Sequence, residues 1–318
     1  MRRHHIPTYR LAIALAALFV CVLRVQAQQA VAFAHYWQME GQFNPAAVGR
    51  TDALNIVAAI QTHAAGYEDG GSTMFASADM AFTLGATRHG VGAYFENDEI
   101  GLFSHKRFAV QYAYHHRLFG GRISVGAELD MLNESVKGSK ADLEDGSDPA
   151  FPTTDINGSK FDFGVGLFYA RKAWYVGLGA RQVASPTVLL GETNEISIKP
   201  LYNFTAGYNF RTHIPFLYIV PSTLLRFDGH NFRADITARV LMERDKKRLY
   251  GGVTYAPGHS VTGFVGGSFH GIDLSYSYEA NTSGMGLGAG QHEVTIGYKL
   301  PLDLGKKGRN LHRSVRWL

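Results

Sequence analysis

The 318-residue sequence predicts an all-β fold, a transmembrane outer-membrane β-barrel of about 14 antiparallel strands, with 12 strands as the alternative count. Apolar and polar residues alternate along most of the chain, and residues 123–131 do so almost without a fault. Successive side chains of a strand point to opposite faces, so each such segment has one apolar and one polar side. A soluble β-sandwich would show the same alternation. The barrel is favoured because the runs are long and carry Tyr and Phe near the ends of their apolar faces, where aromatic rings meet lipid headgroups.

The first 27 residues have the composition of a secretion signal. A basic start precedes an apolar core at residues 11–23, and Val25-Gln26-Ala27 forms a small-residue cleavage site. We expect cleavage between Ala27 and Gln28. Cys21 would permit lipidation, but Val20 is a poor residue before a lipidated cysteine, and the longer export signal follows it. Beyond this region, no stretch approaches the 18 or more apolar residues that a membrane helix requires.

Removal of the signal leaves a formally neutral chain with an uneven distribution of charge. Four arginines leave with it, so 31 Lys+Arg minus 4 gives 27, against 27 Asp+Glu, and the single cysteine is lost as well. Residues 137–157 are mainly acidic. The predicted tail, 302–318, has a basic part without acids: Lys306, Lys307, Arg309, Arg313 and Arg316. Barrels with an even number of strands keep both termini periplasmic and their longer loops outside, so we expect a periplasmic basic tail and an outward acidic loop.

Fourteen strand-like runs with turn signals between them make up the predicted barrel, residues 53–301. The runs are 53–64, 73–84, 88–97, 104–117, 121–135, 159–170, 173–184, 197–211, 215–228, 231–243, 247–256, 259–269, 271–280 and 291–300. Most are near or above the 9–11 residues that cross an outer membrane when tilted. The long connections are expected at 136–158 and 185–196.

The segment between the signal and the first strand, residues 28–52, breaks the alternation. It contains a proline, which does not fit a central strand, and it is too apolar for a free linker. We therefore expect it either to plug the lumen or to dock a partner at the periplasmic rim. The candidate docking residues are Tyr36, Trp37, Phe43, Asn44 and Pro45, together with the five basic residues of the tail.

Catalytic and metal-binding patterns are weak. The histidines are scattered, and no His-x-x-x-His pair, cysteine ligand or acidic calcium loop gives a metal site a basis in the sequence. A hydrolase would need Ser275 or Ser277 brought together with His292 across strands, but polar strand faces commonly carry such residues. The glycine runs lack the helix that follows a phosphate-binding loop, and an exported chain has no nucleic-acid partner. We therefore expect no enzyme activity and no cofactor.

Several short motifs follow one another in order along the mature chain. They are Gln42-Phe43-Asn44-Pro45-Ala46-Ala47-Val48-Gly49, Ser77-Ala78-Asp79, Gly90-Val91-Gly92, Phe161-Asp162-Phe163-Gly164, Tyr276-Ser277-Tyr278-Glu279 and Gln291-His292-Glu293. Their order and spacing resemble the PorP/SprF family, the outer-membrane barrels of the type IX secretion and gliding machinery of Bacteroidetes. The chain departs from the family at Met39-Glu40, where a second Asn-Pro is usual, and at Glu279, where the family typically has Asp. These departures concern the subfamily more than membership.

The resemblance implies a non-enzymatic component of a machine that exports folded cargo. Its implied partners are periplasmic ring proteins, an OmpA-like peptidoglycan-binding protein, outer-membrane lipids, and the C-terminal domain of a secreted cargo or adhesin. A lumen formed by about 14 strands is too narrow for a folded protein, which favours a mount for other proteins over a conduit. The alternative is a porin-like or FadL-like channel for small solutes, in which the N-terminal segment acts as a plug.

Overall fold

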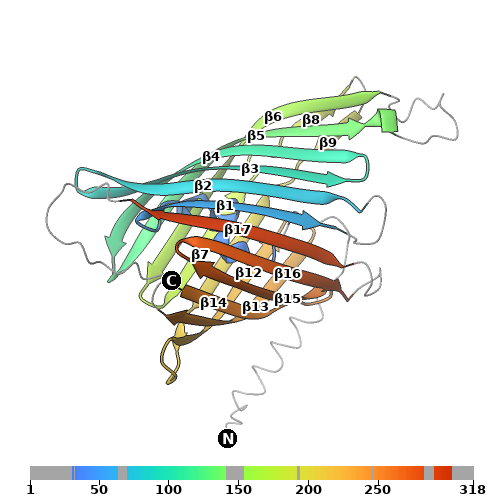
Figure 1. Ribbon diagram of the computed structural model, residues 1–318. Coiled ribbons are helices and arrows are strands. Elements are labelled where there is room, and N and C mark those ends of the chain that lie inside the picture. Colours follow the sequence, from blue (N-terminus) through green and yellow to red (C-terminus); the bar gives the residue numbers. More distant parts are fainter. Residues whose placement is uncertain are drawn as a thin grey trace, which may run out of the picture.

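Fourteen antiparallel strands close into a single barrel in the computed structural model, which describes residues 31, 33–63, 70–140, 154–191, 194–244, 247–282 and 290–302 (Figure 1). The ring is made of β1 (Ala53–Thr62), β2 (Ser72–Leu84), β3 (Thr87–Ile100), β4 (Phe103–Leu118), β5 (Gly121–Lys137), β6 (Asp155–Arg171), β7 (Trp174–Arg181), β10 (Leu201–Tyr208), β12 (Leu217–Phe227), β13 (Phe232–Arg244), β14 (Lys247–Ala256), β15 (Ser260–Phe269), β16 (Ile272–Asn281) and β17 (Gln291–Pro301). Pairing of β1 with β17 and of β10 with β12 closes it, and β11 (Phe210–Arg211) adds a short pairing to β12. The prediction of about 14 antiparallel strands is confirmed.

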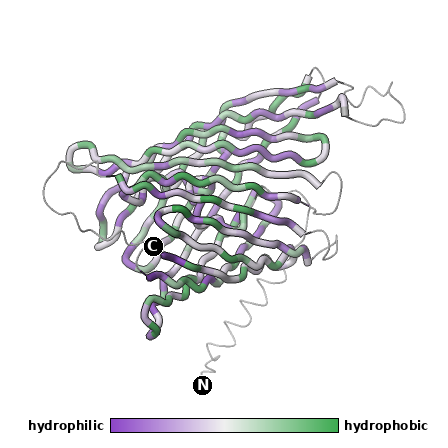
Figure 2. The backbone as a smooth tube through the Cα atoms, in the orientation of Figure 1, coloured by the Kyte–Doolittle hydropathy of each residue, from purple (hydrophilic) through white to green (hydrophobic). Residues whose placement is uncertain are grey.

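The alternation in the sequence separates the two faces of the wall. On β4, Phe108, Val110 and Tyr112 are exposed, whereas the intervening Ala109 and Gln111 are buried. Figure 2 shows the same alternation of hydrophobic and hydrophilic residues along most strands. Because the exposed set is apolar and the buried set is largely polar or small, the outer surface suits lipid and the inner surface suits a polar filling.

The two ends of the barrel differ in their connections. Ala53 pairs with Pro301, so the sheet begins and ends at one rim. Two-residue turns join strands at that rim, which we call the short-turn rim: they lie at 85–86, 119–120, 172–173 and 270–271. The connections 63–71, 138–154, 182–200 and 282–290 lie at the other end, the long-loop rim.

Strands β3 to β6 continue beyond the rest of the wall at the long-loop rim (Figure 1). The lipid-facing row Phe95, Phe108, Met131 and Phe161, which is in register across these strands, marks the end of their apolar surface. The next outward row is polar: Asn97, Lys106, Asn133 and Ser159. With 17 residues each, β5 and β6 exceed the 9–11 that cross the membrane. We call the protruding part the wing.

The predicted connection 185–196 was wrong in detail, because it holds a hairpin of β8 (Thr187–Leu190) and β9 (Asn194–Ser197). The hairpin packs on the wing, where Val188 and Leu190 form a small core with Val136. A Cβ at Gly158 would lie 2.2 Å from the Leu189 carbonyl oxygen, so the glycine permits this close approach. The other predicted connection, 136–158, shrinks to 138–154 because β5 and β6 extend further than expected.

Some sequence-based expectations fall outside the described residues. These are the signal peptide with its cleavage site at Ala27 and Gln28, the tail residues Lys306, Lys307, Arg309, Arg313 and Arg316, and most of the acidic loop.

Candidate functional site: a lumen filled by the N-terminal segment

Residues 33–50, the lumen segment, lie inside the barrel (Figure 1). They form three single-turn helices, η1 (Tyr36–Gln38), α2 (Glu40–Phe43) and η2 (Pro45–Ala47). At the long-loop end of the lumen, the guanidinium of Arg226 donates to the carbonyl oxygen of Val31 at 2.9 Å. At the short-turn end, the N–H of Leu302 donates to the carbonyl of Asp52 at 3.2 Å. The chain therefore crosses the lumen from one rim to the other. In the described part of the chain, no helix is long and apolar enough to span a membrane.

Local sequence explains the turn at the centre of the segment. The side chain of Asn44 accepts from the N–H of Ala46 at 2.9 Å and so caps η2, whose first residue is Pro45. The amide of Asn44 also donates to the carbonyl oxygen of Leu167 in β6 at 3.0 Å. The Asn44 side chain thus stabilises the turn at η2 and also attaches the segment to the wall.

A buried carboxylate holds the segment near the long-loop rim. Glu293 on β17 accepts from the N–H of Ala34 at 2.5 Å, from the N–H of His35 at 3.2 Å, and pairs with His35 Nδ1 at 2.7 Å. Both side chains are essentially inaccessible, at 0% and 1% exposure. Thr295 donates to the same carboxylate. Because a buried carboxylate is costly without partners, Glu293 and the segment stabilise each other.

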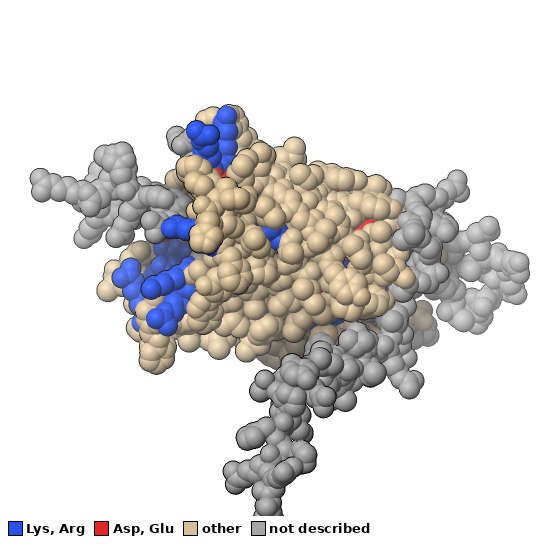
Figure 3. All heavy atoms as spheres, turned by 90° about the horizontal axis from the view of Figure 1, so that it is seen from below, with Lys and Arg blue, Asp and Glu red and all other residues tan. Residues whose placement is uncertain are grey.

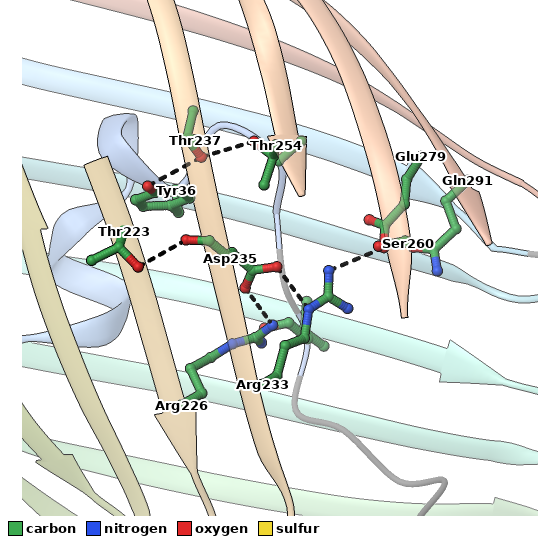
Figure 4. Close-up of polar contacts among 12 residues, drawn as sticks. Tyr36, Thr223, Arg226, Arg233, Asp235, Thr237, Thr254, Ser260, Glu279 and Gln291 are labelled. Carbon is green, nitrogen blue, oxygen red and sulfur yellow. Dashed lines mark hydrogen bonds and ion pairs between the residues drawn. The ribbon is translucent and has the colours of Figure 1, made fainter. Parts of the chain in front are cut away.

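Aromatic side chains of η1 fill the adjacent part of the lumen. The hydroxyl of Tyr36 lies 2.7 Å from Ser222 Oγ. It also donates to Thr237 Oγ1 at 3.2 Å (Figure 4). Trp37 lies under the guanidinium of Arg239, 4.4 Å from the ring centroid, and packs on Phe264. The aromatic rings supply bulk, while their polar atoms meet the polar wall.

A row of small residues across the wall makes room for the segment. Gly90, Ala113, Gly126, Gly166 and Gly179 are in register on five neighbouring strands. A Cβ at Gly126 would lie 2.3 Å from the backbone nitrogen of Ala46, and one at Gly179 would lie 2.2 Å from the carbonyl of Phe43. We call this set the glycine row. Because its members carry no side chain larger than a methyl group, the segment can lie directly on the wall.

The last part of the segment is fixed at the short-turn rim. The N–H of Gly49 donates to Asp79 at 2.8 Å, and Arg88 donates to the carbonyl of Gly49 at 3.0 Å. The carbonyl of Val48 lies 3.0 Å from His115 Nε2. Gly49 has φ of +69°, and a Cβ there would meet Gly90 at 2.4 Å, so this position requires glycine for two reasons.

Several charges elsewhere in the lumen are paired. Asp235 accepts from Arg226 at 3.2 Å and from Arg233 at 2.8 Å, and Arg233 also donates to Glu279 at 3.0 Å (Figure 4). A cavity of about 10 Å³ remains beside this cluster, lined by residues including Phe33 and Arg233, and it has room for about one water molecule. It is smaller than the roughly 300–1,000 Å³ of small-molecule sites.

The residues of the hydrolase alternative do not come together. Ser275 and Ser277 are buried on the inner face of β16, whereas His292 bonds at 2.7 Å to Tyr276, whose exposed side chain lies on the outer face. Among the described residues, no group of three or more His, Cys, Asp or Glu could hold a metal ion.

The structure places all five N-terminal candidates, Tyr36, Trp37, Phe43, Asn44 and Pro45, in the lumen segment, where Trp37 is half-buried and the others are buried. They contact the wall, and a partner could reach them only after the segment left the lumen. Glu293, Asp79 and the glycine row were not among the site residues expected from the sequence. A signal for the glycine row was present in the sequence, since many glycines fall on the polar faces of the strands.

Comparison with known proteins identifies the fold and the family. A barrel described as the CymD monoaromatic hydrocarbon channel is similar, with 13% identity, a TM-score of 0.51, and coverage of 87% of this chain and 95% of that one. A Pseudomonas aeruginosa FadL homologue has 9% identity, a TM-score of 0.50, and coverage of 81% and 92%. At these identities the likeness shows the fold alone. No curated protein sequence matches.

Residues 25–298 match the family described as type IX secretion system membrane protein PorP/SprF. The chain belongs to the PorP/SprF family. It is therefore an outer-membrane barrel of the type IX secretion system, and the resemblance seen in the sequence is confirmed. Several residues of the family-like motifs meet at the lumen segment, among them Asn44, Gly49, Asp79, Gly90 and Glu293. In this chain the motifs thus place the segment in the barrel.

Proposed function

We propose that this PorP/SprF protein is a non-enzymatic mount of the type IX machinery and does not conduct the secreted cargo. The filled lumen is the observation that supports this role most strongly. A folded protein does not fit through a barrel of this size, and here the space is occupied by residues 33–50 as well.

We assign the two ends of the barrel to different partners. The short-turn rim would face the periplasm, as short turns do in such barrels, and would dock ring proteins and an OmpA-like peptidoglycan-binding protein, assisted by the tail residues 306–316. The wing and the long loops would face outward and receive the C-terminal domain of a cargo or adhesin. The polar outer row of the wing, beyond Phe95 and Phe161, supports a surface standing clear of the lipid.

Co-purification from the native membrane tests this assignment. Replacing Lys306, Lys307, Arg309, Arg313 and Arg316 by Gln is expected to weaken the complex with ring proteins, because five positive charges are lost. The matched control replaces Lys106 and Lys160 of the wing and should leave the ring complex intact. If neither variant changes any complex, or if no partner co-purifies with the unaltered protein, the mount is the wrong function.

A channel for small solutes is the second candidate. The observation in its favour is the shared fold with a monoaromatic hydrocarbon channel, together with a segment that could act as a movable plug. This function requires residues 33–50 to leave the lumen, or to rearrange within it, under working conditions.

A further inference from the structure

Two positive side chains face each other on the outer surface at the short-turn rim. Arg244 at the end of β13 pairs in register with Lys247 at the start of β14. Both are exposed and lie on the same outward side as Met242 and Leu249. The two residues between them in the sequence, Asp245 and Lys246, lie outside the described residues and together have no formal net charge. Like charges placed directly opposite each other on a sheet repel, and within the described ranges neither has an acidic partner.

Aromatic rings hold both cations at the edge of the lipid-facing surface. The guanidinium of Arg244 lies 6.0 Å from the centroid of Phe216, and the ammonium of Lys247 lies 5.3 Å from that of Phe269. Each ring is 54% exposed. Rings at the end of an apolar belt lie at headgroup depth, so these two charges lie where lipid phosphates are found.

The surrounding rim adds positive charge and almost no negative charge. Arg171, Lys172 and Arg211 are exposed on the neighbouring turns. Within the described residues of 169–175, 208–219 and 240–250, Glu243 is the one acid, and it pairs with Arg248 at 3.3 Å. Figure 3 shows Lys and Arg gathered at this end of the barrel, with hardly any Asp or Glu among them.

We propose that Arg244 and Lys247 bind the phosphate of an anionic phospholipid of the surrounding leaflet. The phosphate lies between the two charges and relieves their repulsion. The acyl chains lie on Met242 and Leu249, which are 48% and 58% exposed directly above the two cations. This apolar strip and the two rings favour a lipid over free phosphate, which would gain nothing from them.

Native mass spectrometry of the full-length protein in detergent, titrated with dioleoylphosphatidylglycerol, tests the site. R244Q/K247Q is expected to bind this lipid at least roughly tenfold more weakly, since each lost cation near a membrane surface removes a substantial attraction. R244K/K247R should retain binding, and K106Q/K160Q, which removes two charges from the wing, should match the unaltered protein. The affinities of the single variants R244Q and K247Q for this lipid should lie between those of the double variant and the unaltered protein. If the double variant does not fold, the single variants are used for the test.

The possible outcomes distinguish a lipid phosphate from inorganic phosphate, and a lipid from an acidic protein partner. The proposal is supported if R244Q/K247Q binds dioleoylphosphatidylglycerol more weakly and K106Q/K160Q does not. Binding of dioleoylphosphatidylcholine should then change much less in R244Q/K247Q. Equal binding by R244Q/K247Q and K106Q/K160Q overturns it. Displacement of the lipid by millimolar inorganic phosphate would point to a soluble-phosphate site instead. Unchanged lipid binding combined with loss of a co-purifying acidic protein would make this a protein-docking surface.

Discussion

Asn44 is the residue on which the path of the lumen segment most depends. Its side chain caps η2 and donates to the carbonyl of Leu167, so Asn44→Ala removes two hydrogen bonds and leaves buried groups without partners. We expect the free energy of unfolding in detergent to fall by about 1–2 kcal/mol. Urea titration followed by tryptophan fluorescence measures this change. Asn157→Ala, at an exposed position of the wing, is the control and should stay within about 0.5 kcal/mol. Equal effects of the two substitutions would contradict the role of Asn44.

Gly126 tests whether the glycine row makes room for the segment. A valine there would overlap the backbone of Ala46, so we expect Gly126→Val to displace the segment. Cys21 is the one cysteine of the chain and lies in the predicted signal, so Ala46→Cys provides a single labelling site in the mature protein. This cysteine should resist maleimide in the otherwise unaltered barrel, because Ala46 is fully buried. It should label readily when combined with Gly126→Val.

Gly263 provides the matched control for that substitution. It lies on β15, and a Cβ there would meet nothing within 4 Å. Gly263→Val should therefore leave Ala46→Cys protected. Labelling that is the same in both valine variants would mean that the glycine row does not position the segment.

At the scale of elements, the bond between Glu293 and residues 34–35 fixes the start of the lumen segment. Glu293→Gln keeps the shape of the side chain but replaces the carboxylate that accepts from residues 34–35 and that lies 2.7 Å from His35 Nδ1 by a neutral amide. We expect hydrogen exchange at the amides of Ala34 and His35 to become roughly tenfold faster or more, since bonds to a charged acceptor contribute about 1.5–3 kcal/mol. Glu195→Gln, on the exposed hairpin strand β9, should leave these amides unchanged. Unaltered exchange in Glu293→Gln would show that the segment is held elsewhere.

The sequence predicted the wall far better than its contents. A strand such as β4 can be identified from its own residues, because a two-residue period is local and survives along its whole length. The hairpin of β8 and β9 was missed because each strand has four residues, too few for a period to stand out. The glycine row escaped notice for another reason. Gly90, Gly126 and Gly166 are distant in the chain, and they form a row only after the register between strands is known.

The sequence predicted the lumen segment only in part. The break in alternation and Pro45 identified residues 28–52 as separate from the wall, but both a plug and a docking segment fitted that observation. Contacts with residues distant in the chain determine that the segment lies in the lumen. Glu293 is about 260 residues from His35 in the chain, and Asp79 is 30 residues from Gly49. A local pattern does not contain such contacts.

At the scale of the whole molecule, the barrel is closed laterally by the pairing of its strands and filled internally by its own N-terminal segment. What remains for interaction is its two rims and its lipid-facing surface. The rims differ in length of connection and in charge, with the wing at one end and a basic surface at the other. This asymmetry suits a protein that is mounted in one orientation and that contacts different partners at each end.

Single-channel recording in planar bilayers tests the central claim, that residues 33–50 close the barrel. We expect no steady conductance above the bare bilayer for the full-length protein. A variant lacking residues 33–50, with the wall intact from Ala53 onward, should give stable open channels, which also demonstrates insertion. Steady, solute-selective conductance by the full-length protein would contradict the claim and would make the small-solute channel the better function.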